Sequence, residues 1–124
     1  MMRLLAGIAV GAVMWFAAVA VLGFVVGKVW PEMAAITDMK ALTMPMLAAR
    51  LTVSGIASIV GGFVAALIAR ERVRAALGAG VLLLVLFVPY HLTIWTNFPV
   101  WYHLTFFVSL PVLSLLGGAL SPKR

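Results

Sequence analysis

Two copies of one tetrapeptide contain both histidines of the chain. Tyr90-His91-Leu92-Thr93 is followed closely by Tyr102-His103-Leu104-Thr105. An imidazole can take up or release a proton near neutral pH, and it is also a common ligand of haem and of transition metals. A pair of histidines by itself is a weak indication of a metal site, and the chain has no cysteine. We therefore expect neither a metal nor a cofactor.

A small set of polar side chains around these tetrapeptides could bind a ligand or line a pore. The set consists of Arg50, Tyr90, His91, Tyr102 and His103. All five lie near the same predicted face of the membrane. A tyrosine at this level can simply anchor a helix end in the headgroup region. An ionisable side chain at membrane depth is a functional candidate by default, because its burial is costly without a partner.

The ionisable members of this set differ in the direction in which they are expected to point. Helical side chains lean toward the N-terminus of their own helix. Arg50 and His103 belong to helices that should start outside, so we expect them to lean outward and reach water. His91 belongs to a helix that should start inside, so it leans toward the bilayer centre. Its candidate partners are His103, Tyr102 and Arg50.

A simpler role for His91 is structural. A neutral imidazole that bonds a neighbouring threonine or carbonyl would hold the third and fourth helices together. We favour this role over ligand binding, because a single histidine is more often a satisfied buried group than a ligand.

Residues for enzymatic chemistry are scarce. The three acidic residues, Glu32, Asp38 and Glu71, all lie in predicted loops. Their positions weigh against proton-coupled antiport, which usually needs a carboxylate within a span. The chain has no serine–histidine–acid set, no phosphate-binding loop and no HExxH motif. We predict a protein that is not an enzyme and has no catalytic residues.

The composition determines which elements must position these residues. Of the 124 residues, 65% are hydrophobic and 10% are charged, whereas soluble domains are about half apolar and a quarter charged. A small chain cannot bury that much apolar surface in a core of its own. The composition therefore excludes a soluble enzyme, a nucleic-acid-binding domain and a disordered tail, and it indicates a lipid bilayer as the surroundings.

Four apolar stretches are long enough to cross that bilayer as helices. They cover residues 4–27, 46–69, 75–95 and 101–119, and about 20 apolar residues suffice for one crossing. None alternates with a period of two, so a β-barrel is not indicated. The predicted fold is all-α: residues 1–124 form a single domain of four transmembrane helices in an up-down bundle.

The basic residues predict the orientation of the bundle. One side carries Arg3, Arg70, Arg72, Arg74, Lys123 and Arg124 against Glu71, and the other carries Lys28, Lys40 and Arg50 against Glu32 and Asp38. The positive-inside rule then places both termini in the cytoplasm. We expect a multi-pass protein of the cell (inner) membrane, whose net charge of +6 orients the chain and does not recruit nucleic acid.

The first outer loop, residues 28–45, is unusually apolar. Met33, Ile36, Met39 and Leu42 recur at helical spacing. We predict a short helix that lies flat at the outer interface. A loop helix that packs over the bundle fits the pattern equally well.

Small residues form stripes on two of the spans. Gly7 and Gly11 lie on the first span, and Ser54, Ser58, Gly62 and Ala66 lie on the second. Small residues let helix backbones approach closely, which supplies packing energy in lipid. We expect them to serve helix packing within one bundle, with self-association or a partner membrane protein as the alternative. Because its small residues occupy more than one face, the second span should be central.

These observations support more than one function. The first hypothesis is a structural or accessory membrane component that acts through helix–helix association. The alternative is a transporter or channel for a small solute or ion, which would act as an oligomer and use the cluster around His91, His103 and Arg50. A weaker alternative is a membrane subunit that binds quinone or haem.

Overall fold

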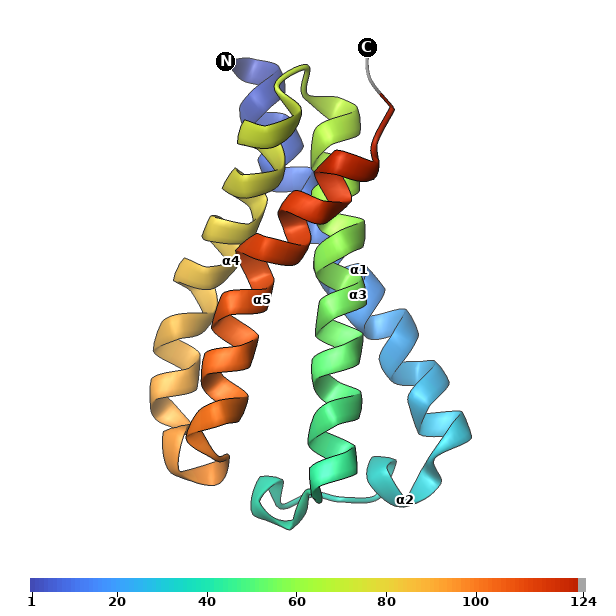
Figure 1. Cartoon of the computed structure of the whole chain (residues 1–124). Coiled ribbons are helices and arrows are strands. Elements are labelled where there is room, and N and C mark those ends of the chain that lie inside the picture. The colour runs from blue at the N-terminus through green and yellow to red at the C-terminus, as the bar shows by residue number, and fades with distance from the viewer. Residues whose placement is uncertain (123–124) are drawn as a thin grey trace.

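The computed structural model describes residues 1–122, and within them every regular element is a helix (Figure 1). In chain order the elements are α1 (Met2–Val29), α2 (Pro31–Ala34), η1 (Met39–Ala41), α3 (Met44–Ile68), α4 (Arg72–Thr93), η2 (Trp95–Asn97) and α5 (Val100–Leu120), where η denotes a 3₁₀ helix.

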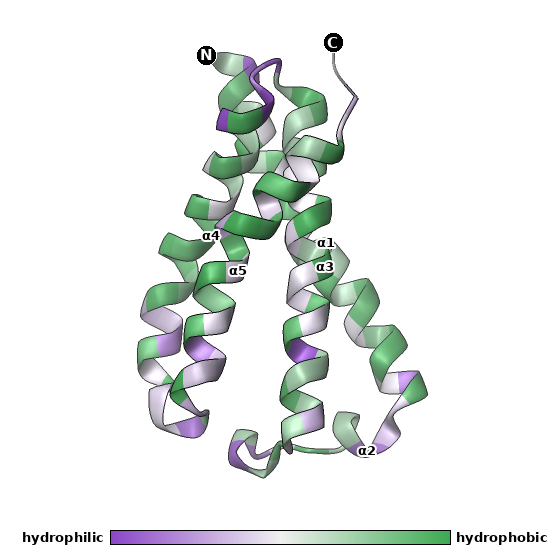
Figure 2. Ribbon diagram, in the orientation of Figure 1, coloured by the Kyte–Doolittle hydropathy of each residue, from purple (hydrophilic) through white to green (hydrophobic). Residues whose placement is uncertain are grey.

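Four of these helices, α1, α3, α4 and α5, are long and apolar enough to cross a membrane. They contain 28, 25, 22 and 21 residues. At 1.5 Å per residue each is about 30 Å long or longer, which matches the hydrocarbon core of a bilayer. Hydrophobic residues cover most of their length (Figure 2). The all-helical fold with four candidate spans is therefore confirmed, and the predicted bounds differ from the observed ones by a few residues.

The bundle is closed at one end and spread at the other. Met2, the turn from α3 to α4 and the last turn of α5 lie together at what we call the terminal end (Figure 1). Residues 30–43 and 94–99 lie at the opposite end, the loop end. Toward the loop end, α1 separates from α4 and α5. The α3 helix packs against each of the other long helices, which agrees with the central position expected for the second span.

Glycines allow the close approach of α3 to α1 and to α5. A Cβ atom on Gly7 would lie 2.7 Å from the carbonyl oxygen of Ala65, and one on Gly11 would lie 2.6 Å from that of Gly61. On the adjacent face of α3, a Cβ on Gly62 would overlap the backbone of Ser114. The helix backbones thus touch where any larger residue would hold them apart.

The hydroxyl-bearing members of the α3 stripe also lie at helix contacts. The Trp15 indole donates from Nε1 to Ser58 Oγ at 3.1 Å, and Ser58 Oγ donates to the Ser54 carbonyl at 2.8 Å. Ser58 and Ala66 are almost fully buried. The Trp15–Ser58 bond joins α1 to α3, whereas the Ser58–Ser54 bond lies within α3.

Arg72 joins α4 to the C-terminal end of α5. Its guanidinium donates to Ser121 Oγ at 3.0 Å and to the carbonyls of Ala119 and Ser121, each at 3.0 Å. The last carbonyls of a helix have no partners within the helix and carry partial negative charge, so a cation there is favourable. Arg72, which the sequence indicated only as an orienting charge, therefore also caps α5.

The loop between α1 and α3 contains a short helix, as predicted, but that helix does not continue from Met33 to Leu42. The loop contains the single-turn α2, an irregular segment and then the short η1. Asp38 has an extended backbone, and its side chain accepts a hydrogen bond from the Lys40 amide at 3.0 Å. This local bond starts a new 3₁₀ turn and ends the helical spacing. Met39 and Leu42 pack against a buried cluster that contains Leu47 and Phe98, so this segment covers the loop end of the bundle.

Candidate functional site

The two histidines form a buried pair between the last turn of α4 and the first turn of α5. Nδ1 of His91 lies 2.7 Å from Nδ1 of His103. The exposed fraction is 3% for His91 and 0% for His103. Because η2 connects α4 to α5 so tightly, the two copies of the tetrapeptide face each other across the helix contact.

A second contact determines which nitrogen of each ring carries a proton. Nε2 of His103 lies 3.0 Å from the carbonyl oxygen of Trp95, and a carbonyl can only accept, so Nε2 is the donor. A neutral imidazole has one N–H. Nδ1 of His103 is therefore an acceptor, and His91 donates to it from Nδ1. This network assigns the tautomers and leaves Nε2 of His91 with a free lone pair.

The expectation that His103 leans outward to water is wrong. Its ring stacks on Trp95 with 4.3 Å between centroids and 9° between planes, while His91 stacks on Phe106 at 4.5 Å. The η2 turn brings the Trp95 carbonyl and indole to the ring of His103. These two contacts satisfy and cover a side chain that would otherwise reach the interface.

Arg50 has a cationic group without a carboxylate partner. Its Nε donates to the Tyr102 hydroxyl at 3.1 Å, and its guanidinium lies 5.5 Å from the centroid of the Phe98 ring. The single ion pair within residues 1–122 joins Arg74 to Glu71 at the terminal end. Arg50 is half-buried, so its charge is balanced only by the Tyr102 hydroxyl, the face of Phe98 and whatever occupies the space beside it.

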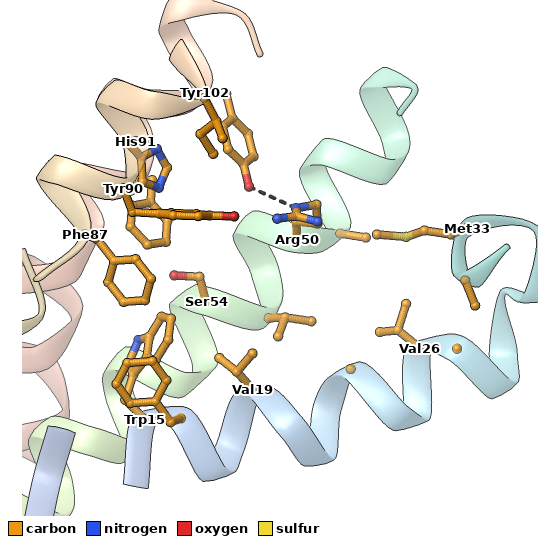
Figure 3. A pocket seen from close by; sticks show the side chains of 18 residues that line it. Trp15, Val19, Val26, Met33, Arg50, Ser54, Phe87, Tyr90, His91 and Tyr102 are labelled. Carbon is orange, nitrogen blue, oxygen red and sulfur yellow. Dashed lines mark hydrogen bonds between the residues drawn. The ribbon is translucent and has the colours of Figure 1, made fainter. Parts of the chain in front are cut away.

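That space is a cavity of about 490 Å³ that is open on one side. α3 contributes Arg50 and Ser54, α1 contributes a row from Trp15 to Gly27, and Met33 of α2 also lines the cavity. Residues of α4 and α5 complete the wall (Figure 3). The cavity belongs to the half of the bundle toward the loop end, where α1 separates from α4 and α5 (Figure 1).

The hydroxyl of Ser54 is the unexplained polar atom of this cavity. Ser54 is 5% exposed, and its Oγ is the one buried side-chain nitrogen or oxygen of residues 1–122 that lacks a hydrogen-bond partner. Figure 3 shows this oxygen directed into the cavity toward Phe87 and Tyr90. A buried hydroxyl without a partner costs about 1–3 kcal/mol, so a bound group that bonds it would recover that energy.

The structure brings together most of the residues that the sequence indicated. Arg50, Tyr90, His91 and Tyr102 all line the cavity, and the Tyr90 and Tyr102 hydroxyls extend toward Arg50 (Figure 3). His103 lies behind His91 and does not line the cavity. Sequence reasoning missed the apolar walls, including Trp15, Phe87 and Phe106, and it assigned Ser54 to helix packing. One available signal was that Ser54 stands four residues after Arg50 and so shares its helix face.

Within residues 1–122, no three histidine or acidic side chains lie close enough together to hold a metal ion. Comparisons with protein-family models, with curated proteins and with solved structures found no match to the chain.

Proposed function

We propose that this protein binds an amphipathic small molecule that enters the cavity from the membrane. The observation that carries the proposal is the combination of apolar walls with a few polar groups that converge at one place. Arg50 and His91 line the cavity, and Ser54 Oγ in its wall has no hydrogen-bond partner. A volume of about 490 Å³ falls within the roughly 300–1,000 Å³ of small-molecule sites, which have this same mixture of lining groups.

The opening of the cavity indicates the source of the ligand. Phe16 on α1 and Tyr90 on α4 line the cavity and are 48% and 44% exposed. Both belong to spans, so their exposed surfaces would face lipid in a membrane. A molecule that enters sideways between α1 and α4 must therefore dissolve in the bilayer. Its polar end would lie at Arg50, and its apolar part would lie along Trp15 and Phe87.

The close packing of the terminal end favours a protein that binds a small molecule over one that transports it through a single chain. Ala65, Ala69, Ala75 and Ala79 form a buried cluster there, and none is more than 1% exposed. The helices are in close contact at this level, so the cavity ends inside the bundle. A transporter or channel would need either a second chain or a large rearrangement.

The contacts between the helices of one chain weigh against an accessory role that acts through helix association. Gly7, Gly11 and Gly62 contact other helices of their own chain. These stripes therefore cannot also serve a partner without opening the bundle. An accessory role would have to use the lipid-facing surfaces. None of the small-residue stripes predicted from the sequence lies on those surfaces. We favour a non-enzymatic binding protein, and the positive-inside rule orients its cavity toward the outer leaflet.

A cavity-filling variant tests the proposal. Gly23 lines the cavity, and a Cβ atom added there meets nothing within 4 Å. Gly23→Leu should occupy the space without disturbing the fold. Ala17→Leu adds the same side chain to an exposed face of α1 outside the cavity and is the matched control.

The measurement is native mass spectrometry of the purified protein titrated with a total extract of membrane lipids. The proposal expects one amphipathic molecule bound per chain in the wild type and in Ala17→Leu, and at least tenfold weaker binding in Gly23→Leu. Equal binding in all three proteins would place the ligand elsewhere and overturn the proposal.

A further inference from the structure

We infer that the ligand is a glycerophospholipid, whose phosphate binds Arg50 and whose ester carbonyl accepts a hydrogen bond from Ser54. This inference rests on the proposed function and specifies the chemistry of the molecule that the cavity holds. Two separate polar features of the cavity support it: an unpaired cation and, one helical turn deeper, an unpaired hydroxyl.

The first feature is the guanidinium of Arg50. It has no carboxylate partner within residues 1–122, and the Tyr90 and Tyr102 hydroxyls point toward it (Figure 3). Because the Tyr102 hydroxyl accepts its bond from Nε, the two terminal NH2 groups of the guanidinium remain as donors for an anion. Arginine binds phosphate through paired N–H donors.

The depth of Arg50 agrees with a phosphate at the membrane interface. Arg50 is in the second turn of α3, a helix of 25 residues that is about 38 Å long and so exceeds the hydrocarbon core by about 4 Å at each end. α3 begins at the loop end, so its side chains lean toward that end. The guanidinium is thereby carried outward from its Cα toward the headgroup level.

The second feature is the hydroxyl of Ser54. Ser54 follows Arg50 by four residues, so it lies on the same face of α3 and about 6 Å deeper. Its Oγ is buried, directed into the cavity and without a partner. In a glycerophospholipid an ester carbonyl lies just below the phosphate, across the glycerol unit. A fatty acid has no polar atom at that second level, and a diacylglycerol has no charge at the first.

The apolar part of the cavity continues from Ser54 toward the middle of the bundle. Trp15 and Phe106 line it there, and Val19 flanks them on α1 (Figure 3). An acyl chain that leaves the ester group would lie against these side chains. A second chain could extend through the opening between α1 and α4 into the surrounding lipid.

Three related probes separate the two contacts. Dioleoylphosphatidylglycerol has both a phosphate and esters, dioleoylglycerol has only the esters, and oleate has only an anionic group. Native mass spectrometry of the full chain in detergent gives the dissociation constant for each. We expect wild-type protein to bind the phospholipid at least tenfold more tightly than either of the other two probes, and inorganic phosphate not to displace it.

Variants assign each contact to its residue. Arg50→Gln should weaken phospholipid binding by roughly ten- to a hundredfold, the effect of a lost charge-assisted bond, and leave dioleoylglycerol within about twofold. Ser54→Ala should weaken both ester-containing probes by roughly threefold to tenfold and leave oleate unchanged. Thr52→Ala removes an exposed hydroxyl of α3 outside the cavity, so it should retain phospholipid binding and is the control.

The outcomes distinguish this inference from the proposed function. If dioleoylglycerol binds as tightly as the phospholipid and Arg50→Gln has no effect, the phosphate contact is wrong, although the cavity still binds an amphiphile. If oleate binds as tightly as the phospholipid and Ser54→Ala has no effect, the glycerophospholipid class is wrong. If no probe and no component of the lipid extract binds, the proposed function itself fails.

Discussion

Nδ1 of His91 and Nδ1 of His103 lie 2.7 Å apart in a contact between α4 and α5 that excludes solvent. The Trp95 carbonyl fixes the proton of His103 on Nε2, and this in turn makes His91 the donor within the pair. The free nitrogen of His91 is thus on the ring that lines the cavity. The bond that joins α4 to α5 therefore also fixes the tautomer of a ring in the cavity wall.

The tautomers follow directly from this arrangement and can be measured. Nitrogen-15 NMR of protein labelled at histidine should show an unprotonated Nε2 in His91 and an unprotonated Nδ1 in His103. His103→Gln would identify the remaining signals. A spectrum with the proton of His91 on Nε2 would contradict the hydrogen-bond network.

Replacing the two histidines by phenylalanine should have effects that are not additive. His103→Phe alone leaves the Nδ1–H of His91 buried without an acceptor, which should lower the free energy of unfolding by roughly 1–3 kcal/mol. The double variant removes both polar groups, so it should be less destabilised than the sum of the single variants. Unfolding by SDS in mixed micelles measures all three, and strictly additive losses would show that the pair contributes nothing as a pair.

A leucine should destabilise the protein at position 62 but not at position 23. A Cβ atom on Gly62 overlaps the Ser114 backbone, whereas one on Gly23 enters open space. Gly62→Leu should therefore separate α3 from α5 and lower the free energy of unfolding by roughly 1–3 kcal/mol or more. Gly23→Leu should stay within about 0.5 kcal/mol of the wild type. Equal stability of the two variants in the same SDS titration would contradict the contact between α3 and α5.

Arg72 and Arg74 are close in sequence but should differ in their contribution to stability. Arg72→Gln removes the hydrogen bonds to the end of α5 and should cost about 1–2 kcal/mol, since the group is partly exposed. Arg74 forms an exposed ion pair with Glu71, and such pairs contribute little. Arg74→Gln is therefore the control. Amide hydrogen exchange should show fraying of the last turn of α5 in Arg72→Gln alone.

The sequence predicted the four long helices because apolar segments in lipid must satisfy their backbone groups internally. It also indicated that His91 and His103 are near each other, since the two tetrapeptides flank one tight connection. It could not predict that His103 is buried, because this depends on where the η2 turn places the Trp95 carbonyl. Nor could it assign Ser54 to a cavity, because that requires the divergence of α1 from α4 and α5, which no local pattern encodes.

The central claim is that the cavity holds an amphipathic molecule with its polar end between Arg50 and Ser54. The most direct test is an experimental density map of the protein purified with its native lipids. The account predicts elongated density that begins beside Arg50, passes Ser54 and continues along Trp15 and Phe106. A cavity closed by α1 packing against α4, or one that contains only water, would contradict the claim.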